Sequence, residues 1–73
     1  MSIVEVKADV TGAVWKILVK VGDHVSEGDD LAILESMKME IPVMAPSDGT
    51  VKEILAKEGD VRNEGETVIF LEV

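Results

Sequence analysis

Residues 8–36 read ADVTGAVWKILVKVGDHVSEGDDLAILES, and residues 45–73 read APSDGTVKEILAKEGDVRNEGETVIFLEV. The two segments align without a gap at a constant offset of 37, since residue 45 is matched with residue 8. Identical residues stand at apolar positions as well as at turn positions: Ala8/Ala45, Gly12/Gly49, Val14/Val51, Ile17-Leu18/Ile54-Leu55, Lys20/Lys57, Gly22-Asp23/Gly59-Asp60, Glu27-Gly28/Glu64-Gly65 and Leu34-Glu35/Leu71-Glu72. Such self-similarity indicates two copies of one half-domain.

The shortness of each copy determines how the two must combine. Neither can bury its own apolar face, so we expect them to pack about an approximate two-fold axis and to share one core. A chain of 73 residues forms a single domain, residues 1–73, and its 47% of apolar residues is enough for a small core. Because the chain has no cysteine, disulfides, thiolate metal sites and cysteine nucleophiles are excluded.

Closely spaced turns that contain glycine divide each copy into short strands. The pattern predicts strands near residues 3–7, 13–20, 30–36, 39–44, 51–56 and 67–72, with short extended pieces near 24–25 and 61–62. Residues 14–21 also carry apolar side chains at helical spacing, but their β-branched content and the flanking Gly12 and Gly22 favour a strand. The predicted fold class is all-β, with two four-stranded antiparallel sheets in a sandwich or flattened β-barrel that has internal pseudo-two-fold symmetry.

The segment between the copies, Leu34-Glu35-Ser36-Met37-Lys38-Met39-Glu40-Ile41, joins two predicted strands without Gly, Pro, Asn or Asp. Direct pairing of these strands predicts a tight hairpin with Met37 and Lys38 at its two central positions. The expected cross-strand pairs are Leu34/Ile41, Glu35/Glu40 and Ser36/Met39. Such turns prefer positive φ at one or both central residues, where Asn-Gly is usual. Met and Lys there would cost on the order of 1–3 kcal/mol in backbone strain, so a role other than folding is expected.

The surroundings of Lys38 follow from this register and from the repeat. Glu35 and Glu40 would face each other across the hairpin, and their field favours the charged ammonium form of Lys38. A self-activated nucleophile or Schiff-base lysine would need a dry or cationic setting instead, so Lys38 is predicted to be acted upon by a partner enzyme. The repeat offset carries Met37-Lys38 to a point just beyond Val73, so the hairpin tip is expected opposite the two chain ends.

The sequence Glu35-Ser36-Met37-Lys38-Met39-Glu40 resembles the signature of biotinyl domains, in which a lysine between two methionines stands on an exposed hairpin. The flanking stretches are similar to patterns shared by biotinyl and lipoyl domains: Gly22-Asp23-His24-Val25-Ser26-Glu27-Gly28-Asp29-Asp30-Leu31, Ala45-Pro46 and Gly49-Thr50-Val51. The resemblance covers almost the whole chain. It implies the hammerhead-type fold of this family, with the modified lysine on a tight hairpin.

The resemblance also implies a cofactor carrier rather than an enzyme, with Lys38 as the point of covalent attachment. Biotin would be attached by biotin protein ligase. The ligase would recognise the hairpin residues Glu35, Ser36, Met37, Met39 and Glu40. The arm would then carry carboxylate between the biotin carboxylase and carboxyltransferase components of a biotin-dependent carboxylase.

Two alternatives stay open. A lipoyl domain would use the same fold and the same hairpin lysine, so lipoate on Lys38, attached by a lipoyl ligase alone or alongside biotin, is the principal one. Lipoyl hairpins typically carry Asp before the lysine and Ala or Val after it, whereas Met37 and Met39 stand here. The more distant alternative is an unmodified β-sandwich that serves as an interaction module. No nucleophile and base pair or phosphate loop supports an enzyme, and no catalytic residue is predicted.

Three features depart from the family pattern. Ser36 stands where biotinyl domains most often have Ala. No segment between Ile17 and Asp30 is long enough for the protruding thumb of some bacterial acetyl-CoA carboxylase carriers, which weakens the expectation of that carboxylase. Arg62 replaces the Val that Val25 of the first copy would predict. None of the three lies at the modified lysine itself.

The formal net charge of −8 restricts the expected partners and location. Nucleic acids and anionic membranes bind clustered Lys and Arg, so neither is expected, whereas basic faces of proteins are. No segment approaches the roughly 20 continuous apolar residues of a membrane span. The N-terminus lacks the features of a signal peptide, and we expect a cytoplasmic monomer.

The remaining conspicuous side chains are assigned to turns and packing. Asp23, Asp29 and Asp30 lack the spacing of a calcium loop and are expected in a solvated turn. The methionines have no second type of metal ligand nearby, so no metal site is predicted. Met44 is expected to fill the core, and Trp15 to be a packing residue or part of a partner-binding face.

Overall fold

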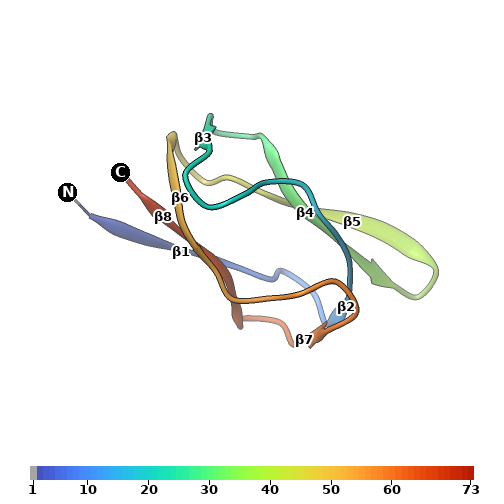
Figure 1. Ribbon diagram of the computed structural model, residues 1–73. Coiled ribbons are helices and arrows are strands. Elements are labelled where there is room, and N and C mark those ends of the chain that lie inside the picture. The colour runs from blue at the N-terminus through green and yellow to red at the C-terminus, as the bar shows by residue number, and fades with distance from the viewer. Residues whose placement is uncertain (1) are drawn as a thin grey trace.

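Eight strands follow one another along the chain in the computed structural model, which describes residues 2–73. They are β1 (Ile3–Lys7), β2 (Gly12–Ile17), β3 (His24–Val25), β4 (Asp30–Ser36), β5 (Met39–Met44), β6 (Gly49–Ile54), β7 (Val61–Arg62) and β8 (Thr67–Glu72). The described residues include no helix suited to crossing a membrane. The predicted all-β class and the number and order of strands are confirmed (Figure 1).

The strands form two antiparallel sheets of four, in the orders β1-β8-β6-β3 and β5-β4-β2-β7. The repeat offset converts β2, β3 and β4 into β6, β7 and β8, and it relates β5 to β1. Each sheet is therefore the symmetry counterpart of the other. Both copies contribute strands to both sheets, because β3 pairs with β6 and β7 pairs with β2. The predicted pseudo-two-fold arrangement of one shared domain follows.

Equivalent hydrogen bonds join the two copies where the chain crosses between sheets. The backbone N–H of Val14 donates to the carbonyl of Asp60 (2.7 Å), and that of Gly59 donates to the carbonyl of Val14 (2.7 Å). In the counterpart position, Val51 donates to Asp23 and Gly22 donates to Val51, both at 2.8 Å. Because each copy satisfies the backbone of the other, neither half can form its complete hydrogen-bond set alone.

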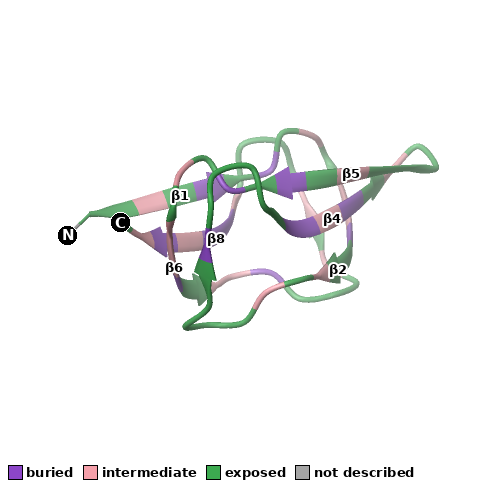
Figure 2. Cartoon of the chain, turned by 90° about the horizontal axis from the view of Figure 1, so that it is seen from above, coloured by how far each residue is buried: buried purple, intermediate pink, exposed green. Residues whose placement is uncertain are grey.

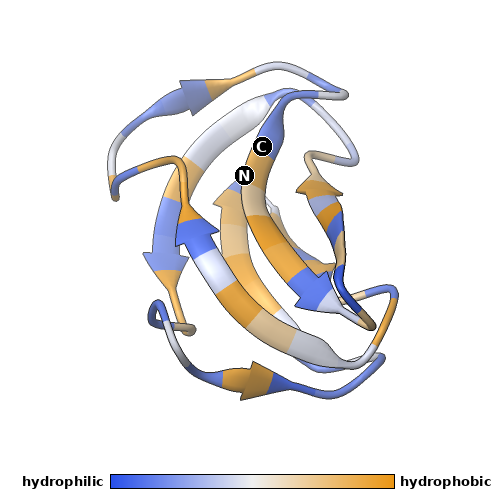
Figure 3. Cartoon of the chain, turned by 90° about the vertical axis from the view of Figure 1, so that its right-hand side faces the viewer, coloured by the Kyte–Doolittle hydropathy of each residue, from blue (hydrophilic) through white to orange (hydrophobic). Residues whose placement is uncertain are grey.

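One apolar core lies between the sheets, and it draws equally on the two copies. The central strands β4 and β8 carry continuous apolar runs, 31–34 and 68–71, with polar residues at the strand ends (Figure 3). The core comprises Val6, Ala8, Val14, Val25, Leu31, Ala32, Leu34, Val43, Ala45, Val51, Ala56, Val68, Ile69 and Leu71. Among the described residues it encloses no buried polar or charged residue, so apolar burial holds the sheets together.

Two predicted strands end earlier than their sequence suggested. The prediction extended them to Lys20 and Ala56, but β2 ends at Ile17 and β6 at Ile54. Both strands contain a bulge, after Val14 and after Val51, and the chain then turns away from its ladder. Beyond the end of β2, Val19 still packs against the core. The N–H of Leu18 donates one isolated backbone hydrogen bond to the carbonyl of Leu31 (2.9 Å). Apolar content alone therefore overestimated strand length.

Carboxylates accept backbone hydrogen bonds in several of the turns between strands. Asp23 accepts a hydrogen bond from the N–H of Lys20 (2.9 Å), and Asp29 accepts one from the N–H of Ser26 (2.9 Å). In the second copy, Asp60 plays the same part toward Lys57 (3.0 Å). These are side chains that mimic a backbone turn, which gives the acidic residues of these loops a structural role.

The molecule is elongated, with extents of 36 × 17 × 17 Å. The hairpin between β4 and β5 projects at one end of the long axis, and the chain termini lie at the other (Figures 1 and 2). The terminal strands are closed by backbone bonds between Ser2 and Val73 (3.1 and 2.9 Å). This confirms the placement of the hairpin opposite the chain ends, because those ends occupy the position that the turn occupies in the other sheet.

Candidate functional site: the Lys38 hairpin

The turn between β4 and β5 has the backbone conformation that the sequence predicted. Met37 has φ of 53° and Lys38 has φ of 66°, and they are the two non-glycine residues with positive φ among those described. Two consecutive positive φ values are typical of a type I′ hairpin, which the right-handed twist of paired strands favours. The predicted pairs Leu34/Ile41, Glu35/Glu40 and Ser36/Met39 are all present. Two residues with side chains therefore occupy positions that Asn and Gly normally fill.

The side chains of the turn are directed into solvent. Met37 is 92% exposed and Met39 is 62% exposed, and Lys38 between them is also exposed. Within residues 2–73, Lys38 has no ion-pair or side-chain hydrogen-bond partner. The hairpin that carries Lys38 projects at one end of the molecule, where a second protein can reach it (Figure 2).

The base of the hairpin is tightly packed against β2. A Cβ atom at Gly12 would lie 2.7 Å from the carbonyl oxygen of Glu35 and 3.3 Å from the Cβ of Ser36. Gly12 therefore allows β2 to approach the hairpin strand closely, and Ser36 is a small residue where little space remains. The sequence prediction used Gly12 only as a strand boundary. Its identity with Gly49 in the other copy was the signal for this role.

The chemistry available at the hairpin is limited to a free amine and two carboxylates. Glu35 and Glu40 are paired across the strands and both are exposed. The described residues contain no group of three His, Asp or Glu side chains that could hold a metal ion. No histidine lies on the hairpin that could take a proton from the amine. The site can accept an acyl group from an activated donor, whereas it has no groups of its own to activate one.

Asparagine in place of Met37 is expected to stabilise the chain. Asn tolerates positive φ better than a residue with a long side chain, so the free energy of unfolding should rise by about 1 kcal/mol. Urea denaturation followed by circular dichroism would measure the change. Met39→Asn is the matched control, because Met39 lies in β5 and has no positive φ. A lower stability of Met37→Asn than of the parent chain would show that the turn is not strained.

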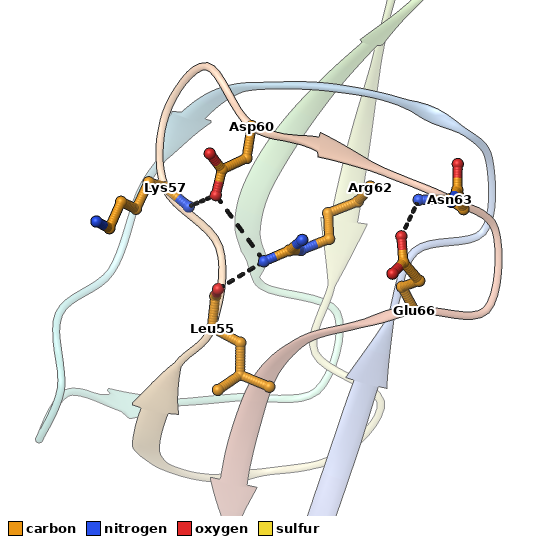
Figure 4. Close-up of polar contacts among 6 residues, drawn as sticks. All are labelled: Leu55, Lys57, Asp60, Arg62, Asn63 and Glu66. Carbon is orange, nitrogen blue, oxygen red and sulfur yellow. Dashed lines mark hydrogen bonds and ion pairs between the residues drawn. The ribbon is translucent and has the colours of Figure 1, made fainter.

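Arg62 is a polar departure from the repeat at a position that is apolar and buried in the first copy. Its Nη2 donates to the carbonyl of Leu55 (2.6 Å) and lies 3.9 Å from Asp60 Oδ2, while its Nε is buried without a hydrogen-bond partner (Figure 4). The counterpart residue Val25 is buried in the core. Arg62 thus replaces an apolar contact by a hydrogen bond to Leu55, the residue that follows β6.

The structure corrects the assignment of Met44 and decides that of Trp15. Met44 was expected in the core, yet it is 54% exposed, because Val43 before it takes the inward position on β5. Trp15 is 44% exposed at the bulge of β2, with Lys16 Nζ 5.0 Å from its ring centroid. Trp15 is therefore a surface residue whose ring contacts a neighbouring cation.

Comparison with known proteins assigns the chain to one family. The family profile for biotin and lipoyl attachment, described as "Biotin-requiring enzyme", matches residues 2–71. The chain is 52% identical over 40 residues to the "Biotin/lipoyl attachment protein" of Bacillus subtilis, a match that covers 55% of each protein. It is 51% identical over 41 residues to the "Biotinylated protein TB7.3 homolog" of Mycolicibacterium smegmatis, covering 56% of this chain and 58% of that one. The matched part thus spans little more than half the length of these relatives.

Solved structures show the same fold within much larger proteins. The urea carboxylase of Kluyveromyces lactis superposes with a TM-score of 0.93 and 38% identity, over 99% of this chain and 6% of that one. A single-chain, multi-domain long-chain acyl-CoA carboxylase gives a TM-score of 0.87 and 25% identity, over 97% of this chain and 7% of that one. The predicted relation to carboxylase systems is thereby confirmed, whereas individual partners are not identified.

Family, fold and site chemistry agree on a carrier function. The profile matches nearly the full chain, and the hairpin offers an acceptor amine without catalytic groups. The resemblance to biotinyl and lipoyl domains found in the sequence is confirmed by the profile match. The chain therefore belongs to the biotin/lipoyl attachment domain family.

Proposed function

We propose that Lys38 is the residue that carries biotin, in amide linkage to its Nζ atom. The observation that carries this proposal is the tight turn in which Met37 and Lys38 both have positive φ and exposed side chains. A strained, exposed turn is not needed for stability, and it presents one amine at the tip of the molecule. The names of the relatives, which include biotinylated proteins, support biotin as the group attached.

The attachment requires a partner enzyme. Biotin protein ligase would form biotinyl adenylate from biotin and ATP, and Nζ of Lys38 would attack its carbonyl carbon and displace AMP. The amine loses its protons to form the amide, so one positive charge disappears. Because neither Glu35 nor Glu40 forms an ion pair or hydrogen bond with the Lys38 amine in the structure, the ligase would supply the group that takes the proton. Met37, Met39, Ser36, Glu35 and Glu40 are the hairpin residues proposed to be recognised.

The loaded domain would act as a mobile substrate of a biotin-dependent carboxylase. One active site would place carboxylate on the cofactor and a second would transfer it to an acceptor, with the chemistry provided by the cofactor and those enzymes. A tethered cofactor meets both sites at a high effective concentration, which free biotin would not reach. The biotin carboxylase and carboxyltransferase components are the proposed partners, and the chain is proposed to work as a cytoplasmic monomer.

Lipoate is the second candidate, and one observation favours it. The relative from Bacillus subtilis is named as an attachment protein for both cofactors. The hairpin geometry does not discriminate between them, because both would form the same amide with Lys38. Met37 and Met39 favour biotin by resemblance, so we place lipoate second.

Intact-mass measurement separates these possibilities. Incubation of the purified chain with biotin protein ligase, ATP and biotin is expected to add one biotinyl group per chain. Protein isolated from its own cell should carry the same single addition. A native pool that carries only lipoyl groups would overturn the choice of cofactor, and an unmodified pool that also resists the ligase would leave the interaction module as the function.

A further inference from the structure

The sheet β5-β4-β2-β7 bears the hairpin. Its outer face carries more apolar residues than the outer face of the other sheet. The pair Val14/Leu34 points into the core, so the pairs on either side of it point outward. These outward pairs extend across the sheet as two rows. The first row is Val61, Ala13, Glu35 and Glu40; the second is Lys16, Ile33 and Pro42, with Trp15 at the bulge. We name Ala13, Trp15, Ile33, Pro42 and Val61 the outer patch.

The repeat provides an internal comparison for this surface. At the equivalent positions of the other sheet, four of the five outer-patch residues are replaced by polar or charged ones. The pairs are Val61/His24, Ala13/Thr50, Trp15/Lys52 and Pro42/Glu5, while Ile33 corresponds to Phe70. The same backbone with the same register therefore folds without apolar residues at these four places. Folding does not account for the outer patch, and an exposed apolar surface of this kind is typical of a binding site.

The outer patch continues directly from the hairpin. Glu35, which pairs with Ala13, is followed by Ser36 and then by the turn residues Met37 and Lys38, so the first row lies one residue pair away from the turn. A protein interface of ordinary size covers about 800 Å² on each partner, so an interface centred on the hairpin would extend over the first row and onto the second. The ligase must bring the Lys38 amine into its own active site. The lysine side chain is much shorter than the 36 Å length of the domain, so the ligase has to contact the end that bears the hairpin.

The charges around the outer patch indicate the chemistry of its partner. Glu35 and Glu40 border it on the side of the hairpin, and both are exposed. A second copy of this chain is a poor occupant, because two molecules of net charge −8 repel each other. A partner with an apolar centre and basic residues at its edge would complement both features.

We propose that the outer patch is the surface on which biotin protein ligase docks while it modifies Lys38. This inference rests on the proposed function, and it extends the recognised surface beyond the hairpin to the face of one sheet. Trp15 is its expected centre, since tryptophan contributes strongly to interfaces and is 44% exposed here. The opposite sheet carries Ile3 and Phe70 on its outer face but is polar at the other four outer-patch positions, so it should remain free of the ligase.

The test replaces outer-patch residues by their own counterparts in the repeat. In the double variant Trp15→Lys and Val61→His, the KM for the carrier in ligase-catalysed biotinylation is expected to rise about tenfold or more, with kcat within about twofold. Glu53→Gln is the matched control, because it changes the net charge by the same amount on the outer face of the other sheet. Its KM should equal that of the parent chain. The assay uses the ligase of the organism that makes this chain.

Circular dichroism and urea unfolding show whether the double variant remains folded, and Val61→His alone keeps the test available if it does not. An unchanged KM in a folded variant would overturn the docking proposal, as would an equal rise in the Glu53→Gln control. Failure of the parent chain to accept biotin is a different outcome, since it contradicts the proposed function itself. The two failures are therefore distinguished in one assay.

Discussion

Arginine in place of Lys38 is expected to abolish biotinylation completely. The guanidinium group stays protonated at any pH at which proteins are stable, so it offers no free amine to attack an acyl adenylate. Arg keeps the positive charge and the long stem, which leaves the surroundings of Glu35 and Glu40 unchanged. Intact mass after incubation with biotin protein ligase, ATP and biotin should remain that of the unmodified chain.

Lys52→Arg is the matched control for this prediction. Lys52 is an exposed lysine of β6 on the outer face of the other sheet, and its replacement should leave the single biotinyl addition intact. Thermal unfolding of the two variants should coincide with that of the parent chain, since neither residue is buried. A biotinyl group still found on Lys38→Arg would move the attachment to another lysine and remove the basis of the proposed function.

The hairpin could be predicted from the sequence in unusual detail, for a physical reason. If Leu34 pairs with Ile41 so that both face the core, then Glu35 pairs with Glu40 and Ser36 with Met39. Met37 and Lys38 are then the two residues of the turn. The absence of Gly or Asn there then implied positive φ for residues that avoid it. The repeat predicts the position of the hairpin, because the offset of 37 relates the turn to the chain ends.

Other features depend on contacts that no local pattern contains. The ends of β2 and β6 lie where a bulge turns the strand out of its ladder, yet the apolar residues beyond Ile17 and Ile54 resemble strand continuation. The inward or outward position of Met44 depends on the irregular register between Asp30 and Ala32. The close approach at Gly12 involves the backbone of a distant strand. These are tertiary effects, which outweigh propensity in so short a chain.

The outer patch illustrates how the repeat can separate function from folding. A single apolar surface residue such as Val61 has no interpretation on its own, since such residues are common on soluble proteins. Its equivalence to His24 shows that the same backbone position accepts a polar side chain. The same comparison applied to the core gives the opposite result, because Leu34 and Leu71 are both completely buried leucines. Buried positions are apolar in both copies apart from Val25/Arg62, whereas exposed positions at which only one copy is apolar are candidates for function.

This reasoning predicts that Leu34→Ala and Leu71→Ala have nearly equal effects. Each leucine is 0% exposed, and each pairs with an equivalent buried valine, Val14 or Val51. Truncation of a buried leucine costs about 2–5 kcal/mol, from the lost transfer free energy and the cavity that remains. A domain of this size has a free energy of unfolding near the lower end of about 5–15 kcal/mol, so either variant should lose a large part of it.

Urea denaturation followed by circular dichroism measures both effects and tests whether the core is shared. One cooperative transition is expected in each variant, with similar slopes and with midpoints lowered by similar amounts. Leu18→Ala is the control for a leucine at the surface, because Leu18 is 47% exposed and its loss should change stability little. Two separate transitions in either variant would mean that each copy holds a core of its own.

In the shared core, damage to Leu71 near the chain ends must destabilise the distant hairpin as well. Biotin acceptance by Leu71→Ala should therefore fall in urea together with the folded fraction, although Lys38 and its neighbours are unchanged.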